Sequence, residues 1–215
     1  MAAPDGVPVT SVPSDPDPDP PPEASVPTLT LTGEPTADEL LSDNAFALLV
    51  GMLLDQQIAM ELAFVGPSRL AERLDGPLTP TTVAATDLDE LETLFRQKPA
   101  LHRYPGSMSK RVHALASHIV EEYDGDAAAV WTGVTDGAEL KKRLGDLPGF
   151  GDQKARIFVA LLGKQCGVQP EGWRDAAGDY GLEGHRSIAD VTDKATLEAV
   201  REWKQARKAA TKAAG

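Results

Sequence analysis

Apolar side chains recur three and four residues apart from residue 36 to the end of the chain, and no segment alternates strictly as a β-strand would. The stretch 107–123 is typical, because Val112, Leu115 and Ile119 fall on one face of a helix. Such a stripe must pack against a neighbouring element. Aromatic residues make up only 5% of the chain, so aliphatic side chains must build the core. The pattern predicts an all-α protein of six to nine helices.

The helical segments can be placed from their periodicity and capping residues. We expect a short capped helix followed by one long buried helix within residues 36–64. The next helix lies within residues 86–97, with Thr86 as its N-cap. Further helices are predicted within residues 107–123, 136–147, 151–167 and 192–215.

The two ends of the chain differ from the middle in charge. Residues 1–27 include the run PSDPDPDPPPEASVP, which can neither bury area nor pair its backbone and predicts a disordered acidic tail. Eight of the 33 acidic residues and no Lys or Arg lie in residues 1–40, so the formal charge of −12 falls to −4 for the rest. We expect one domain over residues 28–200 and a basic C-terminal tail over 201–215. A nucleic-acid partner is therefore compatible with the local charge.

The composition also excludes several classes of site. The single cysteine, Cys166, rules out a disulfide framework and an all-cysteine metal or iron–sulfur centre, and it is expected to be a plain buried thiol. The four histidines show no ligand spacing, so no metal or cofactor is predicted. No apolar run reaches the ~18 residues that a membrane helix needs, and no signal peptide is apparent. A cytoplasmic location follows.

Residues 144–162 read LGDLPGFGDQKARIFVALL and join two predicted helices through a turn with two glycines. A dinucleotide-binding fingerprint is excluded because no strand precedes the turn, and a P-loop is excluded because Gly-Lys-Ser/Thr is absent. Gly149 and Gly151 allow a sharp bend and a close approach of the backbone. The free amides that begin the second helix favour an anion.

The spacing Leu-x-x-Leu-x-Gly-Phe-Gly-x-x-x-Ala-x-x-Phe-Val from Leu144 matches the helix-hairpin-helix pattern at every defined position. The surrounding segments resemble the DNA glycosylase superfamily that carries this hairpin (HhH-GPD), especially its endonuclease III-like branch, over residues 40–175. LLVGMLLDQQIA resembles that family's early helix, and GSMSKRVHALASHIVEEYDGD resembles the helix that leads into the hairpin. The resemblance implies a two-lobed helical bundle, here without the iron–sulfur cluster of many relatives.

The resemblance also implies which residues bind double-stranded DNA. The hairpin holds a phosphate, and Gln57, with Gln56 beside it, matches a glutamine near the flipped base. A basic stretch over residues 95–111, which includes His102, forms a candidate phosphate platform. Trp131, Trp173 and Trp203 are expected to be core or helix-docking residues. The full predicted set of DNA contacts is Leu147, Pro148, Gly149, Phe150, Gly151, Lys154, Gln57, Gln56, Lys110 and Arg103.

Members of this family break the glycosidic bond of the flipped base. In bifunctional members a lysine two residues after the second hairpin glycine forms a Schiff base; here that residue is Gln153, so no lyase activity is expected. The family also carries an aspartate some 18 residues further on, often after a valine. Gln169, which follows Val168, is the best match to that pattern, whereas counting 18 residues from Gln153 gives Glu171. Glu171 and Asp175 lie close by and are the candidate catalytic carboxylates.

Three functions fit the sequence. The first is a monofunctional DNA N-glycosylase of base excision repair, acting as a nucleoid-associated monomer on a damaged or mismatched base. The second is a non-catalytic protein that binds DNA lesions on a glycosylase scaffold. The third is an α-helical protein-interaction module. A carboxylate facing the DNA-binding groove would separate the first from the second, and Gln57 facing the hairpin would separate both from the third.

Overall fold

The computed structural model describes residues 28–213, with side chains as far as Ala210, so the predicted acidic tail 1–27 lies outside the described residues. In this part of the chain ten α-helices and no strand are present, which confirms the all-α prediction and exceeds the expected number of helices by one. The helices are α1 (Pro35–Asp43), α2 (Ala45–Leu54), α3 (Met60–Ala71), α4 (Pro80–Ala85), α5 (Leu88–Arg96), α6 (Pro105–Tyr123), α7 (Gly137–Asp146), α8 (Asp152–Gln165), α9 (Trp173–Ala177) and α10 (Lys194–Ala213).

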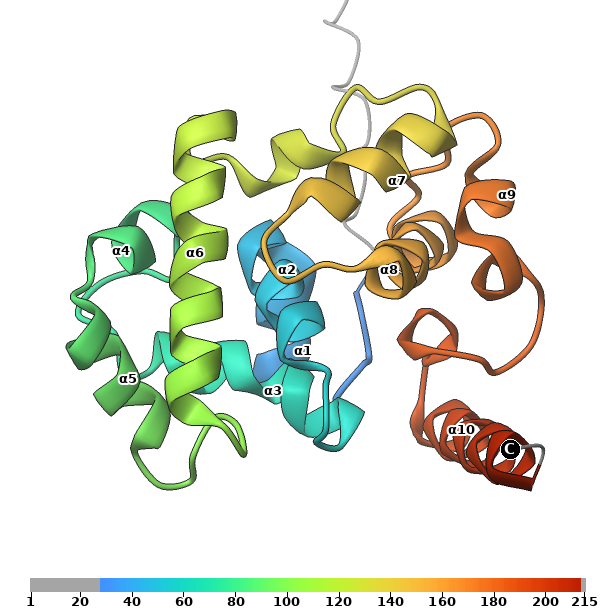
Figure 1. Cartoon of the computed structure of the whole chain (residues 1–215), viewed down its shortest axis with the longest axis horizontal. Coiled ribbons are helices and arrows are strands. Elements are labelled where there is room, and N and C mark those ends of the chain that lie inside the picture. Colours follow the sequence, from blue (N-terminus) through green and yellow to red (C-terminus); the bar gives the residue numbers. More distant parts are fainter. Residues whose placement is uncertain (1–27, 214–215) are drawn as a thin grey trace, which may run out of the picture.

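The helices form two groups on either side of α2 (Figure 1). In one group α4 and α5 pack on the long helix α6, and in the other α7 and α9 pack on α8. Helix α2 touches both α6 and α8, and nine consecutive residues of it, Phe46–Leu54, are buried. One continuous apolar cluster runs through both groups. Because α2 ends between the two groups, whatever follows Leu54 lies where they meet.

The prediction of one long buried helix within residues 36–64 is wrong, because a non-helical loop over Asp55–Ala59 separates α2 from α3. The polar residues there begin where the buried sequence ends, and Gln57 takes a left-handed backbone with φ of 58°. A residue in the left-handed region cannot continue a right-handed α-helix. The helical spacing of the apolar residues does not reveal this backbone conformation, which places the short loop at the surface.

Two smaller expectations also change. The N-cap of α5 is Asp87, whose carboxylate accepts from the amides of Asp89 and Glu90, whereas Thr86 ends α4. Cys166 follows the last residue of α8 and is half-buried, and burial raises the pKa of its thiol to about 11.

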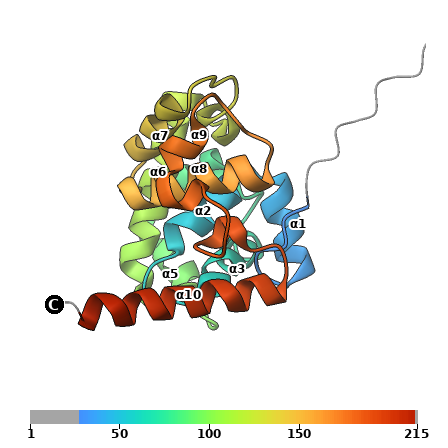
Figure 2. The same cartoon turned by 90° about the vertical axis from the view of Figure 1, so that its right-hand side faces the viewer.

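Helix α10 runs without a break across residue 200, where the basic tail is predicted to begin, and lies along one side of the molecule (Figure 2). None of the helices described here is long and apolar enough to cross a membrane.

Candidate functional site

The glycine turn between α7 and α8 is built on two buried apolar side chains. Leu147 and Phe150 are 2% and 5% exposed, and the Phe150 amide donates to the Leu147 carbonyl at 3.0 Å. The Phe150 ring meets Phe158 of α8 edge-on at 6.0 Å between ring centroids. These two side chains therefore anchor the turn and leave Pro148, Gly149 and Gly151 to form its outer surface.

The two glycines of the turn have different roles. Gly149 has φ of +84°, and a Cβ built on it would lie 2.3 Å from Cδ1 of the buried Leu53 in α2. Gly151 is the N-cap of α8 with φ of −89° and ψ of 174°, an extended conformation open to any residue, and no atom lies within 4 Å of its Cβ position. Thus the bend and the close approach require Gly149, whereas Gly151 leaves open space in front of α8.

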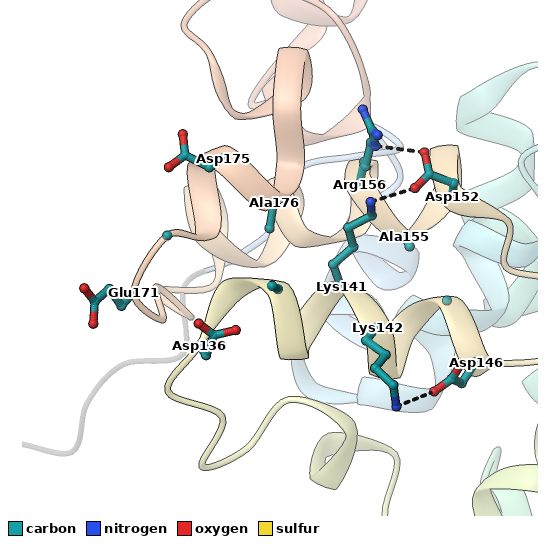
Figure 3. Close-up of a pocket in the computed structure, with 13 residues that line it drawn as sticks. Asp136, Lys141, Lys142, Asp146, Asp152, Ala155, Arg156, Glu171, Asp175 and Ala176 are labelled. Atoms are coloured by element: carbon teal, nitrogen blue, oxygen red, sulfur yellow. Dashed lines mark hydrogen bonds and ion pairs between the residues drawn. The ribbon is translucent and has the colours of Figure 1, made fainter.

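The open space at Gly151 faces amides that lack helical partners, as at any helix start. No side chain caps this end of α8. The first residue of the helix, Asp152, is paired with Lys141 at 2.7 Å and Arg156 at 2.8 Å (Figure 3). The hydrogen bond from Lys141 lowers the pKa of the Asp152 carboxyl. Two cations thus offset the negative charge that would otherwise oppose a phosphate here.

Lys154 points from α8 towards the end of α2. Its ammonium donates to the carbonyls of Met52, at 2.7 Å, and Leu53. A cation at a helix C-terminus is favourable there. Burial lowers the pKa of Lys154 to about 8; the Asp55 carboxylate opposes this shift and the Arg111 guanidinium adds to it. Two hydrogen bonds therefore hold the Lys154 ammonium at the end of α2, and its contact with a phosphate stays a prediction.

The loop after α2 is held from the side of α6. The Gln56 side chain donates to the Leu53 carbonyl at 3.0 Å and accepts from the Arg111 guanidinium at 3.1 Å. His102 bonds the Gln56 carbonyl at 2.9 Å through Nε2, and the Tyr104 amide donates to its Nδ1 at 3.0 Å. Because Nδ1 accepts, Nε2 carries the proton and the ring is neutral.

His102 is 3% exposed, so its expected place in the basic platform is wrong: it supports the loop from within the protein. Arg103 and Lys110 of the same stretch are exposed. The Arg103 guanidinium lies 5.5 Å from the centroid of the Tyr104 ring.

A pocket of about 530 Å³ opens between the end of α2, the start of α8 and one face of α10, and we call it the α2–α8–α10 pocket. The exposed, left-handed Gln57 forms part of its wall. Non-glycine residues with this backbone conformation are uncommon, and they occur at functional sites as well as in turns. The pocket is lined by Met52, Asp55, Gln56, Gln57, Gln153, Lys154, Ile157, Tyr180, Arg186, Trp203, Lys204, Arg207 and Lys208. Four of the predicted site residues or their neighbours therefore meet here: Gln56, Gln57, Gln153 and Lys154.

The two predicted carboxylates lie elsewhere. Glu171 and Asp175 are exposed and line a second pocket of about 770 Å³ between α7, α8 and α9. Figure 3 shows both carboxylates at its edge, turned away from Lys141 and Arg156. Neither lines the α2–α8–α10 pocket. The structure therefore does not bring Glu171 or Asp175 together with Gln57.

The structure thus places the hairpin at the start of α8 and Gln57 in the wall of a pocket that borders the same helix. A family model described as HhH-GPD superfamily base excision DNA repair protein matches residues 50–214. The chain belongs to this family. The match runs from within α2 to the end of α10 and so contains the hairpin and every residue that lines the α2–α8–α10 pocket. No curated protein matches the chain.

Sequence reasoning missed several residues of the pocket. Asp55 stands next to Gln56 in the early-helix motif, and that adjacency was the available signal. Trp203 was expected to dock a helix; it is half-buried, lines the pocket, and has the Arg207 guanidinium 5.1 Å from its ring centroid. Tyr180 lines the pocket through a short 3₁₀ segment, Gly178–Gly181, which has no periodicity to predict it. The described residues contain no group of three or more His, Cys, Asp or Glu side chains that could hold a metal ion.

Proposed function

We propose that this base excision repair protein is a monofunctional DNA N-glycosylase that removes a damaged or mismatched base from double-stranded DNA. The observation that carries the proposal is the α2–α8–α10 pocket beside the hairpin, with Gln57 and Gln153 in its wall. Pockets of 300–1,000 Å³ are typical of small-molecule sites, and a flipped base is a ligand of that kind. The partly apolar rings of Tyr180 and Trp203 offer faces on which a base can stack.

The proposed path of the DNA passes the hairpin and the start of α6. The α8 amides hold one phosphate, and the exposed Arg103 and Lys110 hold others. These contacts carry no base information, so binding to undamaged duplex is expected to be independent of sequence. The basic residues of α10 border the pocket and extend the positive surface. The family assignment and this surface disfavour a protein-interaction module.

The absence of lyase activity is proposed from Gln153. Its amide donates to the Tyr180 hydroxyl at 2.9 Å and cannot form a Schiff base. The neighbouring amine, Lys154, is bonded to the carbonyls at the end of α2. Base release is therefore expected to leave an intact abasic strand.

A panel of duplex oligonucleotides with uracil, alkylated, oxidised and mismatched bases tests this proposal. Release of one base, with strand cleavage appearing only after alkali and no covalent adduct after borohydride treatment, is the expected result. A borohydride adduct would refute the Gln153 argument and implicate Lys154. The sequence-based carboxylates stay predictions, which Glu171→Gln and Asp175→Asn variants test in the same assay.

A non-catalytic lesion-binding protein is the second candidate, acting at the nucleoid as the first would. It is favoured by one observation, namely that Glu171 and Asp175 lie outside the α2–α8–α10 pocket. Tight binding to one lesion of the panel without release of any base would establish it.

A further inference from the structure

We propose that Asp55 is the carboxylate that activates the attacking water in the α2–α8–α10 pocket and stabilises the cationic sugar. This inference rests on the proposed glycosylase function. It moves the catalytic carboxylate from the segment after the hairpin helix to the end of α2.

The position of Asp55 sets it apart from every other acidic residue described. Among the residues that line the α2–α8–α10 pocket it is the one carboxylate, with five Lys or Arg residues around the same cavity. Its side chain is 14% exposed, which leaves the carboxylate reachable from the pocket but largely shielded from bulk water. Shielding of this kind strengthens its attraction for a positive charge developing on the sugar.

Cations from two elements lie beside the Asp55 carboxylate. The Lys204 ammonium of α10 lies 3.9 Å from its Oδ2. Lys154 of α8 is close enough for the Asp55 carboxylate to oppose the fall in the pKa of that lysine. Without these cations a carboxylate at the C-terminus of α2 would face the negative end of the helix dipole. An ionised carboxylate is the form that can accept a proton from water.

The loop that carries Asp55 is fixed before any DNA binds. The neighbouring Gln56 is bonded through its carbonyl to His102 and through its side chain to Arg111. The Asp55 amide itself donates to the Gly51 carbonyl at 3.1 Å. A catalytic group contributes fully only when its supports hold it in place.

The proposed reaction conserves atoms and charge. A water oxygen forms a bond to C1′ of the flipped nucleotide while the C1′–N bond breaks, and the electron pair of that bond leaves with the base. Asp55 accepts one proton from the water and returns it to solvent. The departing base takes up one proton from solvent, so the products are the free base and an abasic 2-deoxyribose in an intact strand.

The first test needs no knowledge of the lesion. Two duplexes are compared, one with a pyrrolidine abasic analogue, whose ring nitrogen is protonated like the cationic sugar, and one with the neutral tetrahydrofuran analogue. The full-length protein is expected to prefer the cationic duplex by on the order of ten- to a hundredfold. Asp55→Asn should abolish that preference, so that this variant binds the two duplexes with equal affinity.

The matched control is Asp124→Asn, which removes the same charge from an exposed residue at the end of α6. Asp124 has φ of 52°, a conformation that asparagine also accepts. It should keep the preference. Asp55→Ser is the second neutral variant, in case the amide disturbs the loop. The proposal is overturned if the wild type shows no preference, if both Asp55 variants keep it, or if Glu171→Gln or Asp175→Asn loses it instead.

The second test measures base release on whichever panel duplex the wild type processes. Asp55→Asn is expected to lower single-turnover release by about 10²–10⁴-fold. Retention of more than half of the wild-type rate would refute the role of Asp55. If the wild type releases no base but Asp55 still determines the cationic preference, the glycosylase function fails while the placement of Asp55 beside the sugar stands.

Discussion

Replacing Gly149 by alanine should destabilise the protein through two separate effects. The left-handed backbone, with φ of +84°, costs a residue with a Cβ on the order of 1–2 kcal/mol. The added Cβ would also lie 2.3 Å from Cδ1 of Leu53, a fully buried side chain with little room to turn. Overpacking of this kind typically costs about 1–3 kcal/mol. We therefore expect a loss of about 2–5 kcal/mol, or roughly 5–15 °C in Tm for a chain of this length.

The comparison with Gly151 makes this prediction specific. Gly151→Asp adds a carboxylate where no atom lies within 4 Å and where aspartate is a good N-cap, so stability should change by less than about 1 kcal/mol. The same carboxylate would occupy the α8 amides and repel a phosphate, so duplex binding should be lost. Thermal unfolding and fluorescence anisotropy on both variants measure the two effects. An unchanged Tm for Gly149→Ala, or full DNA affinity for Gly151→Asp, would contradict the roles assigned to the two glycines.

Two further predictions concern Lys154 and the acidic tail. Because the pKa of Lys154 is about 8 in the folded protein and ordinarily 10.5, the unfolded chain binds more protons between those values and stability rises with pH there. Urea unfolding should show a gain of roughly 2 kcal/mol from pH 7.5 to 9.5 that Lys154→Met lacks, and an equal gain in both proteins would argue against a buried ammonium. Deletion of residues 1–27 should leave Tm nearly unchanged and keep or tighten duplex affinity, since Asp-Pro repeats build no core and their charge opposes DNA; a large drop in Tm would show that the segment packs.

The hairpin and the helices around it could be predicted because their signals are local. The glycine spacing determines the turn, and the stripe of Val112, Leu115 and Ile119 determines which face of α6 is buried. Gln57, which its position in a motif singles out, lies in the wall of the α2–α8–α10 pocket. Such features depend on neighbours in the sequence, and periodicity reports them directly.

The rest of the site depends on contacts between distant segments. Lys154 meets carbonyls about a hundred residues away, and His102 bonds Gln56, which lies 46 residues away in the sequence. Periodicity carries no information on such pairs. The break after Leu54 was missed because the apolar run of α2 masks the point at which the core ends. Glu171 was selected by counting residues along the chain. Such a count does not show which of the two pockets a side chain lines.

The attachment of α10 has a consequence for the way DNA binding is measured. This helix is joined to the rest of the protein by charged contacts, Arg201 with Glu61 and Lys204 with Asp55. Added salt screens such pairs as well as protein–phosphate contacts. The slope of log affinity against log salt would then contain two contributions, the release of counterions from DNA and the weaker attachment of α10 at high salt. The slope would therefore overstate the number of phosphates that the protein contacts. Repeating the titration with Arg201→Gln, which removes one of these protein pairs, would separate the two contributions.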